Sequence, residues 1–496
     1  MKYNCDIWLT TYYMAISDNL RPFPLWQYFE AITKIPRPSK KEEKIISFLV
    51  DFAKLHNLEF KKDNVGNLLV YKPASKNKKH SPVIVLQSHV DMVCEKNSNV
   101  SHNFETDPLE IYIDGDWVKA KGTTLGADDG IGVAAMMAIL ADPSIEHGQL
   151  ECLFTVDEET GLTGAFELHA GFFEGKTLIN LDSEDEGELF IGCAGGIDTT
   201  AAFDYTPQQV FEPGLGYLVS ITGLQGGHSG DEIHRDRGNA VKVMTAFLNE
   251  LFADINADLH RFEGGNLKNA IPREAFATVL IPHPAKDMFL SLCDSFRQKT
   301  QKEFAMNEPS FSFIVDSIPL PETKIKKDFA MRLLGALSAC PHGVIAWSRD
   351  IEDLVETSTN LASIKFNDNR EIIVTTSQRS SVEIAKHNIA RQVATVFSDA
   401  GAKINHSKGY PGWTPNLNSS LLKITTCSYE ALFDEKPRIK AIHAGLECGL
   451  FLEKYPGLDM ISFGPTIKGA HSPDERLHIP SVTKFWELLI SVLNQI

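Results

Sequence analysis

The chain lacks the features of several specialised protein classes. Its eight cysteines form no CxxC pair, and several lie within apolar runs, where a reduced thiol behaves as a small apolar side chain. This pattern favours a reducing compartment, so we expect a cytoplasmic protein. No segment approaches the roughly 20 uninterrupted apolar residues that a membrane helix requires, and we therefore expect no membrane partner.

An excess of positive charge is also missing. The 65 Asp and Glu residues outnumber the 48 Lys and Arg residues, and the resulting formal net charge of −17 disfavours binding to nucleic acids. Residues 1–21 lack the basic start, clean apolar core and cleavage site of a signal peptide, so we expect a poorly defined extension. The 496 residues, 43% of them hydrophobic, are enough for two or three domains with apolar cores.

A dinucleotide-binding motif is absent as well. The segment TLGADDGIGVAAMM places a glycine-rich turn before an expected helix, but Gly126, Gly130 and Gly132 do not form the GxGxxG pattern. Two aspartates at the start of that helix would also repel a pyrophosphate. We therefore exclude nucleotide binding at this turn.

What is present is an alternation of short apolar strands and helices. Apolar residues recur at helical spacing in KKEEKIISFLVDFAKLHN, behind Ser39 as an expected cap, and strand and helix patterns then alternate up to residue 182. This order predicts an α/β fold whose catalytic domain has a mixed, largely parallel sheet with helices on both faces.

The alternation is interrupted and then resumes. Between residues 197 and 408 the order helix, strand or hairpin, helix, strand occurs twice, which predicts an α+β domain of two similar halves. From residue 409 the strand and helix alternation returns. If His471 in this last part joins carboxylates near the N-terminus, residues 197–408 form an insertion that splits one domain into residues 1–196 and 409–496.

Histidine and acidic residues follow several of the apolar runs. Individually these are weak signals, because adjacent glutamates are usually solvated and an aspartate in GADDG can simply cap a helix. Together they are stronger, since an unpartnered carboxylate after a buried strand would cost several kcal/mol. The set comprises His89, Asp91, Asp128, Glu158, Glu159, Asp182 and His471.

These residue types fit a two-metal hydrolytic site. Imidazole from His89 and His471 with oxygen from Glu159 and Asp182 gives a mixed ligand set typical of zinc, although cobalt and manganese are also accepted, and Asp128 could bridge two divalent ions. Two ions about 3.5 to 4 Å apart would share and activate a water molecule. We assign the remaining two acidic residues to other roles: Glu158 as general base and Asp91 as the hydrogen-bond acceptor that orients His89.

Longer motifs carry a family resemblance. The segments QSHVDMV, TTLGADDGIG, FTVDEETGLTGA, NLDSED, GGHSG, AIHAGLECG and GPTIKGAHSPDERL resemble the aminoacyl-histidine dipeptidase family (Xaa-His dipeptidase, peptidase D) of the co-catalytic zinc peptidase superfamily. The resemblance runs from about residue 22 to the C-terminus. It implies a cytosolic, commonly homodimeric metallodipeptidase with a split catalytic domain, an inserted lid, and the ligands, base and supporting aspartate given above.

The resemblance also implies roles for residues of the inserted lid. His228 of the GGHSG segment would donate to the carbonyl oxygen of the scissile bond, although without the resemblance a glycine-rich turn capped by Ser229 is the preferred interpretation of the segment. Arg379 or Asn269 would bind the free carboxylate of a dipeptide, and each could instead be structural. In residues 409–496, outside the expected lid, His443 would approach the substrate, and the nearby Glu447 would orient it or cap a helix.

Three functional hypotheses follow. The leading hypothesis is metal-dependent hydrolysis of dipeptides, with a preference for aminoacyl-histidine (carnosine-like) substrates. A tripeptidase or an N-acyl-amino-acid deacylase of the same superfamily would use the same metal site. A catalytically silent metal-binding protein is the alternative of another class, and Glu158 argues against it because such a protein needs no general base.

Overall fold

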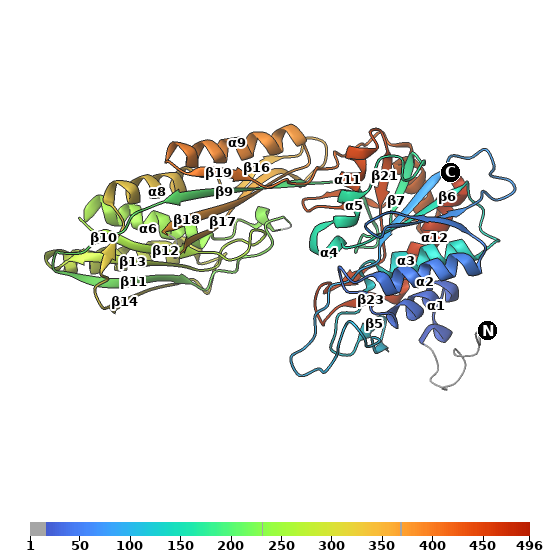
Figure 1. The fold of residues 1–496 in the computed structure, drawn as a ribbon, viewed down its shortest axis with the longest axis horizontal. Helices are drawn as coiled ribbons and strands as arrows, with labels where there is room; N and C mark the ends of the chain where they lie inside the picture. The colour runs from blue at the N-terminus through green and yellow to red at the C-terminus, as the bar shows by residue number, and fades with distance from the viewer. Residues whose placement is uncertain (1–15, 231, 368–369) are drawn as a thin grey trace. The chain divides into compact units, whose positions relative to one another are not determined.

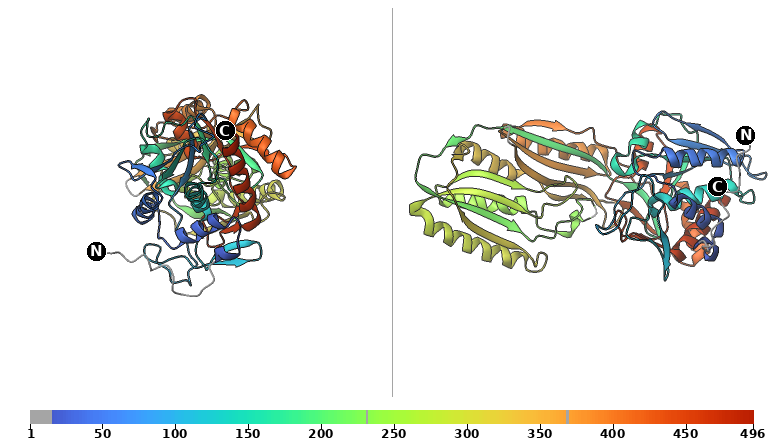
Figure 2. Two further views of the ribbon diagram at one scale, coloured as in Figure 1. Left: turned by 90° about the vertical axis from the view of Figure 1, so that its right-hand side faces the viewer. Right: turned by 60° about the horizontal axis from the view of Figure 1, so that its bottom comes forward.

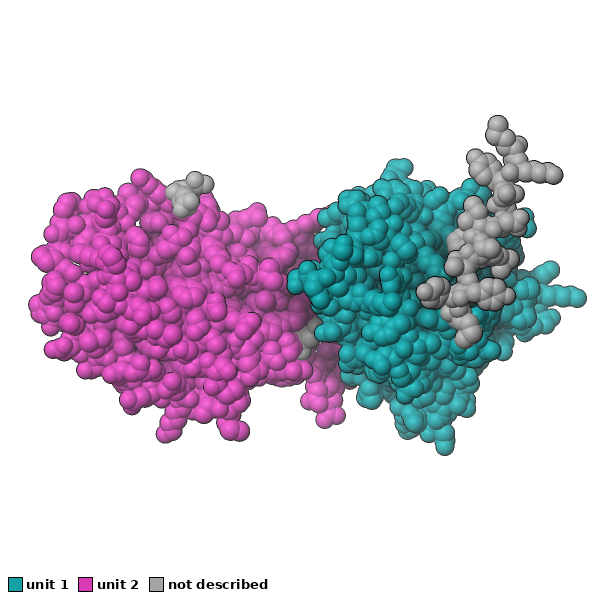
Figure 3. Space-filling view, turned by 90° about the horizontal axis from the view of Figure 1, so that it is seen from below, with its two compact units in different colours: residues 1–191, 416–440, 450–496 teal, residues 192–415, 441–449 magenta. Residues whose placement is uncertain are grey.

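The structure, a computed structural model, describes residues 16–230, 232–367 and 370–496, so most of the expected N-terminal extension lies outside the described residues. The chain forms two compact units, coloured separately in Figure 3. Unit 1 comprises the chain up to Ile191, Asn416–Lys440 and Leu450–Ile496, and unit 2 comprises Gly192–Pro415 and Ala441–Gly449.

These units divide the chain differently from the boundaries expected at residues 196 and 408. Residues 441–449 belong to unit 2, because the backbone N–H of Ala194 lies 3.0 Å from the carbonyl oxygen of Ile442 and 3.1 Å from that of Ala444. The expected boundaries remain a prediction for independently folding domains. Within the described ranges, no helix is long and apolar enough to cross a membrane.

Unit 1 is built around an eight-stranded sheet with the order β1-β2-β6-β3-β7-β21-β8-β20. Its strands are β1 (Glu59–Lys62), β2 (Leu68–Lys72), β3 (Ile84–His89), β6 (Leu150–Thr155), β7 (Thr177–Asn180), β8 (Glu188–Cys193), β20 (Arg438–Ile442) and β21 (Asp459–Ser462). A second sheet, of order β22-β23-β5-β4, contains β4 (Ile111–Asp114), β5 (Trp117–Ala120), β22 (Ile467–Lys468) and β23 (Arg476–His478).

The larger sheet is mixed, and its centre is parallel. β3 pairs in parallel with both β6 and β7, and β7 pairs in parallel with β21, whereas β2 and β8 join this centre by antiparallel pairing. Every residue of β3 and β6 is buried, which explains their nearly continuous apolar sequences. Figure 1 shows β21, from the C-terminal part of the chain, beside β7. The mixed α/β architecture expected from the sequence is confirmed.

Helices cover this sheet. They are α1 (Phe23–Thr33), α2 (Glu43–Leu55), α3 (Ala127–Ala141), α4 (Glu158–Gly161), α5 (Thr163–Glu167), α10 (Ser420–Phe433), α11 (Glu447–Lys454) and α12 (Ile479–Gln495), preceded by the short η1 (Ile16–Asn19). In α2 the apolar face predicted by the spacing is buried at Ile45, Ile46 and Leu49. Ser39 does not cap this helix as expected, because α2 begins four residues later and the Ser39 hydroxyl donates to Asp91 instead.

Unit 2 contains a nine-stranded sheet in which every pairing is antiparallel. Its elements are β9 (Gly195–Asp204), β11 (Gly214–Thr222), η2 (Ile233–Arg235), α6 (Ala240–Asp254), β12 (Asp258–Gly264), β13 (Ala275–Pro282), η3 (His283–Ala285), α7 (Lys286–Phe304), β14 (Ser312–Ile318), α8 (Lys327–Ala339), β16 (Gly343–Trp347), β17 (Val355–Asn367), β18 (Glu371–Ser380), α9 (Glu383–Asp399) and β19 (Lys403–His406). The short strands β10 (Gln208–Gln209) and β15 (Thr323–Lys324) pair separately.

The strand order of unit 2 is consistent with two similar halves. The order β14-β11-β13-β12 of one half repeats as β19-β9-β18-β17 in the other, and the halves meet where Gly264 of β12 pairs with Ile364 of β17. The long strands lie alongside one another in Figure 2. Apolar side chains of the helices, such as Phe247 and Phe397, form one core with those of the sheet.

Candidate metal centre

The seven residues predicted for the catalytic centre all belong to unit 1. His89 is the last residue of β3, Glu158 and Glu159 begin α4 just after β6, and Asp182 lies two residues beyond β7. These three strands are parallel neighbours, so their carboxyl ends meet at one edge of the sheet. This parallel pairing therefore brings side chains from distant positions in the sequence to one place.

Asp128 lies at the centre of the group. Its Oδ1 atom is 3.1 Å from Nε2 of His89, and its Oδ2 atom is 3.1 Å from Nε2 of His471. Each imidazole nitrogen also approaches a second carboxylate: His89 lies 3.4 Å from Asp182, and His471 lies 3.0 Å from Glu159. The donor atoms thus form two groups that share Asp128, one with His89 and Asp182 and the other with Glu159 and His471, each close enough together to hold one ion. A third group joins His89 to Glu158 and Glu159.

The carboxylates of this group outnumber its imidazoles and raise the pKa of both histidines. Burial alone would lower the pKa of His89, but the carboxylates of Asp182, Asp128 and Asp91 outweigh it and raise that pKa well above its usual value. Hydrogen bonds to Asp128 and Glu159 raise the pKa of His471 to about 11. The carboxylates therefore create a strongly negative potential at both imidazoles, which divalent cations would neutralise.

One further observation fits a metal ion. Within the part of the chain that the structure describes, Oε1 of Glu159 is buried and has no hydrogen-bond partner. A buried carboxylate oxygen without a donor is costly, and a cation beside it removes that cost. The donor set of imidazole and carboxylate, together with this oxygen, is suited to divalent metal ions.

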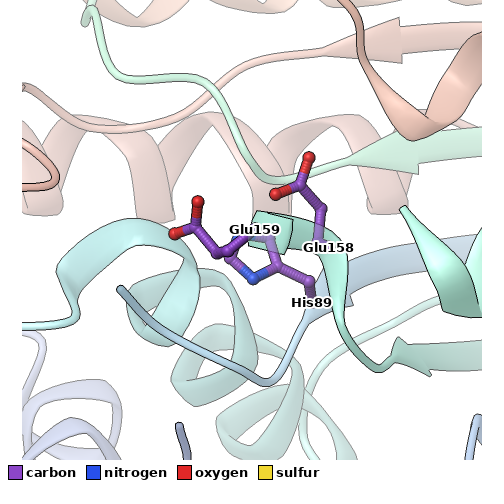
Figure 4. A group of neighbouring side chains, drawn as sticks. All are labelled: His89, Glu158 and Glu159. Atoms are coloured by element: carbon purple, nitrogen blue, oxygen red, sulfur yellow. The ribbon is translucent and has the colours of Figure 1, made fainter. Parts of the chain in front are cut away.

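Figure 4 shows the side chains of Glu158 and Glu159 leaving α4 in different directions, and one oxygen of each is still close enough to a His89 ring nitrogen for the three to hold a metal ion. We expected this divergence from alternation along an extended segment, but both residues lie in α4. Successive residues of a helix are about 100° apart, and this rotation separates the two side chains. The Glu159 carboxylate lies 3.0 Å from Nε2 of His471.

Asp91 contacts more than the predicted partner. Its Oδ1 atom lies 3.4 Å from Nδ1 of His89, an ion-pair distance longer than a good hydrogen bond. The same carboxylate accepts the backbone N–H groups of Glu158 at 3.0 Å and Glu159 at 3.2 Å, and the Ser39 hydroxyl at 2.8 Å. Asp91 therefore fixes the start of α4 relative to β3 as well as lying beside the imidazole.

A neighbouring group of three carboxylates is close enough together to hold a cation, and it consists of Glu42, Asp91 and Asp157. These carboxylates already accept hydrogen bonds from other groups of the protein. Glu42 accepts the backbone N–H groups of Lys40 and Asp157, and Asp157 accepts two threonine hydroxyls. These hydrogen bonds satisfy the carboxylates, so the group shapes the loop before α4.

The predicted substrate-binding residues lie in unit 2, and this includes His443, which we expected in the second part of the catalytic domain. The Nε2 atom of His443 is 2.7 Å from the Ser358 hydroxyl, and Ser358 pairs directly with Arg379 across β17 and β18. His228 pairs with Ala270, next to the exposed Asn269. A side chain at Gly230 would come within 3 Å of both the His228 ring and the His443 carbonyl oxygen.

Arg379 is well placed to bind an anion. It is 8% exposed, and one of its terminal nitrogens donates to the Tyr410 hydroxyl at 2.9 Å. Its Nε atom, by contrast, is among the buried polar atoms of the described residues that have no hydrogen-bond partner. An unused donor on a buried guanidinium is the feature expected of a carboxylate-binding arginine.

Sequence comparison identifies the family of the chain. Residues 85–495 match the model of peptidase family M20/M25/M40. The chain belongs to this family. It is therefore a hydrolase that acts on peptide bonds, as predicted.

Two relatives are similar over nearly their whole length. The chain is 41% identical over 483 residues to the cytosol non-specific dipeptidase of Escherichia coli K12, which covers 97% of this chain and 99% of that protein. The crystal structure of aminoacylhistidine dipeptidase from Vibrio alginolyticus superimposes with a TM-score of 0.89 at 42% identity, covering 97% of this chain and 98% of that one. Aminopeptidase PepT from Bacillus cereus, with a TM-score of 0.56 and 15% identity, shares the fold.

Two buried residues beside the centre were not predicted. Arg37 and Glu475 hydrogen-bond to the backbone of the segments that carry His89 and Asp128. In the sequence, Arg37 lies in a Pro-Arg-Pro stretch and Glu475 in a polar stretch four residues after His471, where charged residues are normally exposed. The one sequence feature that could have indicated a role was the position of Glu475 within the same motif as His471.

Proposed function

We propose that the protein is a dipeptidase that uses two divalent metal ions, with His89, Asp128, Glu159, Asp182 and His471 as ligands. The observation that carries this proposal is the position of Asp128, whose two oxygens each face a different imidazole at 3.1 Å. A pair of ions requires two groups of donor atoms, each with nitrogen and oxygen, that share a single carboxylate.

The chemistry divides between the ions and the side chains. Two bound ions would lower the pKa of a water molecule and stabilise negative charge on the carbonyl oxygen of the scissile bond. Glu158 would accept the proton of the attacking water and pass it to the leaving amine, a role that its position beside Glu159 at the start of α4 supports. Asp91, 3.4 Å from His89, would hold that imidazole in the orientation needed for metal binding.

We further propose a preference for unblocked dipeptides, in particular aminoacyl-histidine substrates. The names of the Escherichia coli and Vibrio alginolyticus relatives both describe dipeptidases, and the second describes the aminoacyl-histidine preference. Arg379, with its unused Nε donor, is the residue that we expect to bind the substrate carboxylate. His228, Asn269 and His443 are expected to contribute further substrate contacts.

The metal, oligomeric state and location form part of the same proposal. Zinc is the expected ion, with cobalt and manganese as functional substitutes, because imidazole and carboxylate ligands accept all three. We expect a cytoplasmic homodimer that binds neither nucleic acids nor membranes. The mass of the particle in solution, measured by light scattering, tests the dimer.

One preparation can test the activity and the metal together. Metal analysis should find two ions per chain, and chelation should abolish cleavage of carnosine-type dipeptides until zinc, cobalt or manganese is restored. A panel of dipeptides, tripeptides and N-acyl amino acids measured in parallel distinguishes the proposal from a tripeptidase or a deacylase. Full activity without metal would refute the mechanism, and metal binding without any hydrolysis would favour the catalytically silent alternative.

A further inference from the structure

The buried carboxylate of Glu475 accepts four consecutive backbone N–H groups, from the loop before α3 and the first two residues of that helix, which include Asp128. Its Oε2 atom lies 2.7 Å from the nitrogen of Leu125 and 2.9 Å from that of Gly126, and its Oε1 atom lies 2.7 Å from the nitrogen of Ala127 and 3.3 Å from that of Asp128. These amides are at the start of α3, where backbone donors have no partner within the helix. Both oxygens of Glu475 are therefore used to fix this backbone.

Arg37 holds the same loop from its carbonyl side. Its side chain is 1% exposed and donates to the carbonyl oxygens of Val90 and Asp91, both at 2.9 Å, and to that of Gly126. Val90 and Asp91 directly follow His89 at the end of β3. A side chain at Gly126 would overlap the Arg37 guanidinium, which explains why a glycine, here with a φ of 65°, occupies that position.

The two charged residues thus connect three segments that are far apart in the sequence. Arg37 connects the end of β3, with His89, to the loop before α3, and Glu475 connects that loop to the segment that contains His471. Both oxygens of Glu475 and both terminal nitrogens of Arg37 are hydrogen-bonded, although Nε of Arg37 is among the buried polar atoms of the described residues that have no hydrogen-bond partner. Breaking these contacts would leave a buried charge poorly paired, so they hold the loop in one conformation. A carboxylate that is shared between two ions needs this precision, because each oxygen must face its own ion.

We propose that Glu475 and Arg37 are positioning residues that fix the Asp128 carboxylate between His89 and His471. The proposal rests on the assignment of Asp128 as a shared metal ligand. It assigns a function to two charged residues that bind the loop backbone, and it predicts that their loss weakens metal binding while the five ligands remain in the sequence.

Replacement of Glu475 by glutamine provides the most direct test. The side chain keeps its shape, but the amide can accept with only one of its two positions and would turn an NH2 group toward two backbone donors. When the metal-free protein is titrated with Co2+ and followed by visible absorption, E475Q should bind the ions about 10- to 100-fold more weakly than the unmodified protein. Arg37→Lys, which keeps the charge but cannot contact three carbonyl oxygens in the same way, should also weaken binding.

Glu151→Gln is the matched control. Glu151 is also fully buried and accepts two backbone N–H groups, those of Glu174 and Gly175, but it lies near the start of β6, whereas Glu158 follows the far end of that strand. This variant should unfold more easily than the unmodified protein and still bind Co2+ with normal affinity.

The possible results separate the hypotheses. Weaker Co2+ binding in E475Q and R37K, together with normal binding in E151Q, supports the positioning role. Normal Co2+ affinity in E475Q, or an equal loss in E475Q and E151Q, would overturn it. If the unmodified protein binds no pair of ions, the proposed function itself is wrong, and this inference fails with it.

Discussion

His471 follows Asp128 by 343 positions in the sequence, yet its Nε2 atom lies 3.1 Å from Oδ2 of the aspartate. Shortly before His471 in the sequence, β21 pairs with β7 in the centre of the unit 1 sheet. The proposed metal centre therefore depends on pairing between strands that are far apart in the sequence. The contact of Asp128 with two imidazoles also distinguishes it from ligands that contact only one.

Replacement of Asp128 by asparagine should remove more metal than replacement of Asp182. Asp182 belongs only to the group with His89 and Asp128, so D182N leaves the group of Asp128, Glu159 and His471 intact and should retain about one ion per chain. D128N disrupts both groups and should retain less than one ion at the same free metal concentration. Metal analysis after dialysis measures this difference.

The exposed Asp114 of β4, which pairs with Lys119, provides a control for these two variants. D114N should retain the full metal content. Equal metal contents in D128N and D182N would show that Asp128 does not bridge.

Glutamine in place of Glu158 should abolish turnover while metal content stays near normal. The substitution keeps the shape of the side chain but removes the proton acceptor, and a general base contributes about 100- to 10,000-fold to the rate. Steady-state hydrolysis of a carnosine-type dipeptide, measured with metal analysis of the same sample, tests this expectation. The exposed Glu167 of α5 is the matched control, and a retained rate in E158Q would place the base elsewhere.

Much of the fold and the proposed ligands could be predicted because the signals are local. The continuous apolar sequence of β3 is what a strand between two parallel neighbours requires, and His89 at its end was identified for that reason. Different directions for the Glu158 and Glu159 side chains were expected from an extended segment, but both residues lie in α4, and the sequence did not show that only two residues separate this helix from the end of β6.

Arg37 and Glu475 could not be predicted because their environment is created by tertiary structure. A charged side chain in a polar stretch is normally solvated, and only the folded chain shows that backbone groups from distant segments surround it. The pairing of Ser358 with Arg379, and the hydrogen bond of Ser358 to His443, likewise depend on strand register and on a loop far away in the sequence.

Arg379→Lys should raise KM for dipeptides with a free carboxylate. A lysine cannot form the two parallel hydrogen bonds that a guanidinium makes to a carboxylate, and the loss of one hydrogen bond to a charged group corresponds to an increase of about 10- to 100-fold. Dipeptides with an amidated C-terminus should show little difference between R379K and the unmodified protein. Arg391→Lys, on the exposed face of α9, is the control, and an equal effect on both substrates would contradict carboxylate binding.

The stability of unit 2 should decrease in mild acid because of His342. Burial, together with the nearby positive charge of Lys242, lowers the pKa of this imidazole to about 4. The backbone N–H of Leu361 lies 3.3 Å from Nδ1 of His342, which must be unprotonated to accept this hydrogen bond. The neutral ring is thus favoured in the folded state, whereas the unfolded chain takes up a proton near pH 6.5.

The direction of the pH dependence follows from the lower pKa of His342 in the folded state than in the unfolded state. The contribution of His342 is fully present above about pH 6.5 and is lost as the pH falls toward about 4, because the unfolded state binds the extra proton in this window. The free energy of unfolding from urea titrations should therefore decrease less between these pH values in His342→Asn than in the unmodified protein. His387→Asn, an exposed position on α9, should follow the unmodified protein, and parallel curves for all three proteins would contradict the prediction.

β21 is the last strand at the centre of the unit 1 sheet to be synthesised. β7 ends at Asn180 and its parallel neighbour β21 begins at Asp459, about 280 residues later. At about 5 to 20 residues per second, the ribosome needs on the order of 15 to 60 seconds for this interval. During that time one edge of β7 lacks its final partner, and an unpaired strand edge is a template for aggregation. His471 is added later still, so under the proposed ligand set the nascent chain remains without peptidase activity until almost all of it has been made.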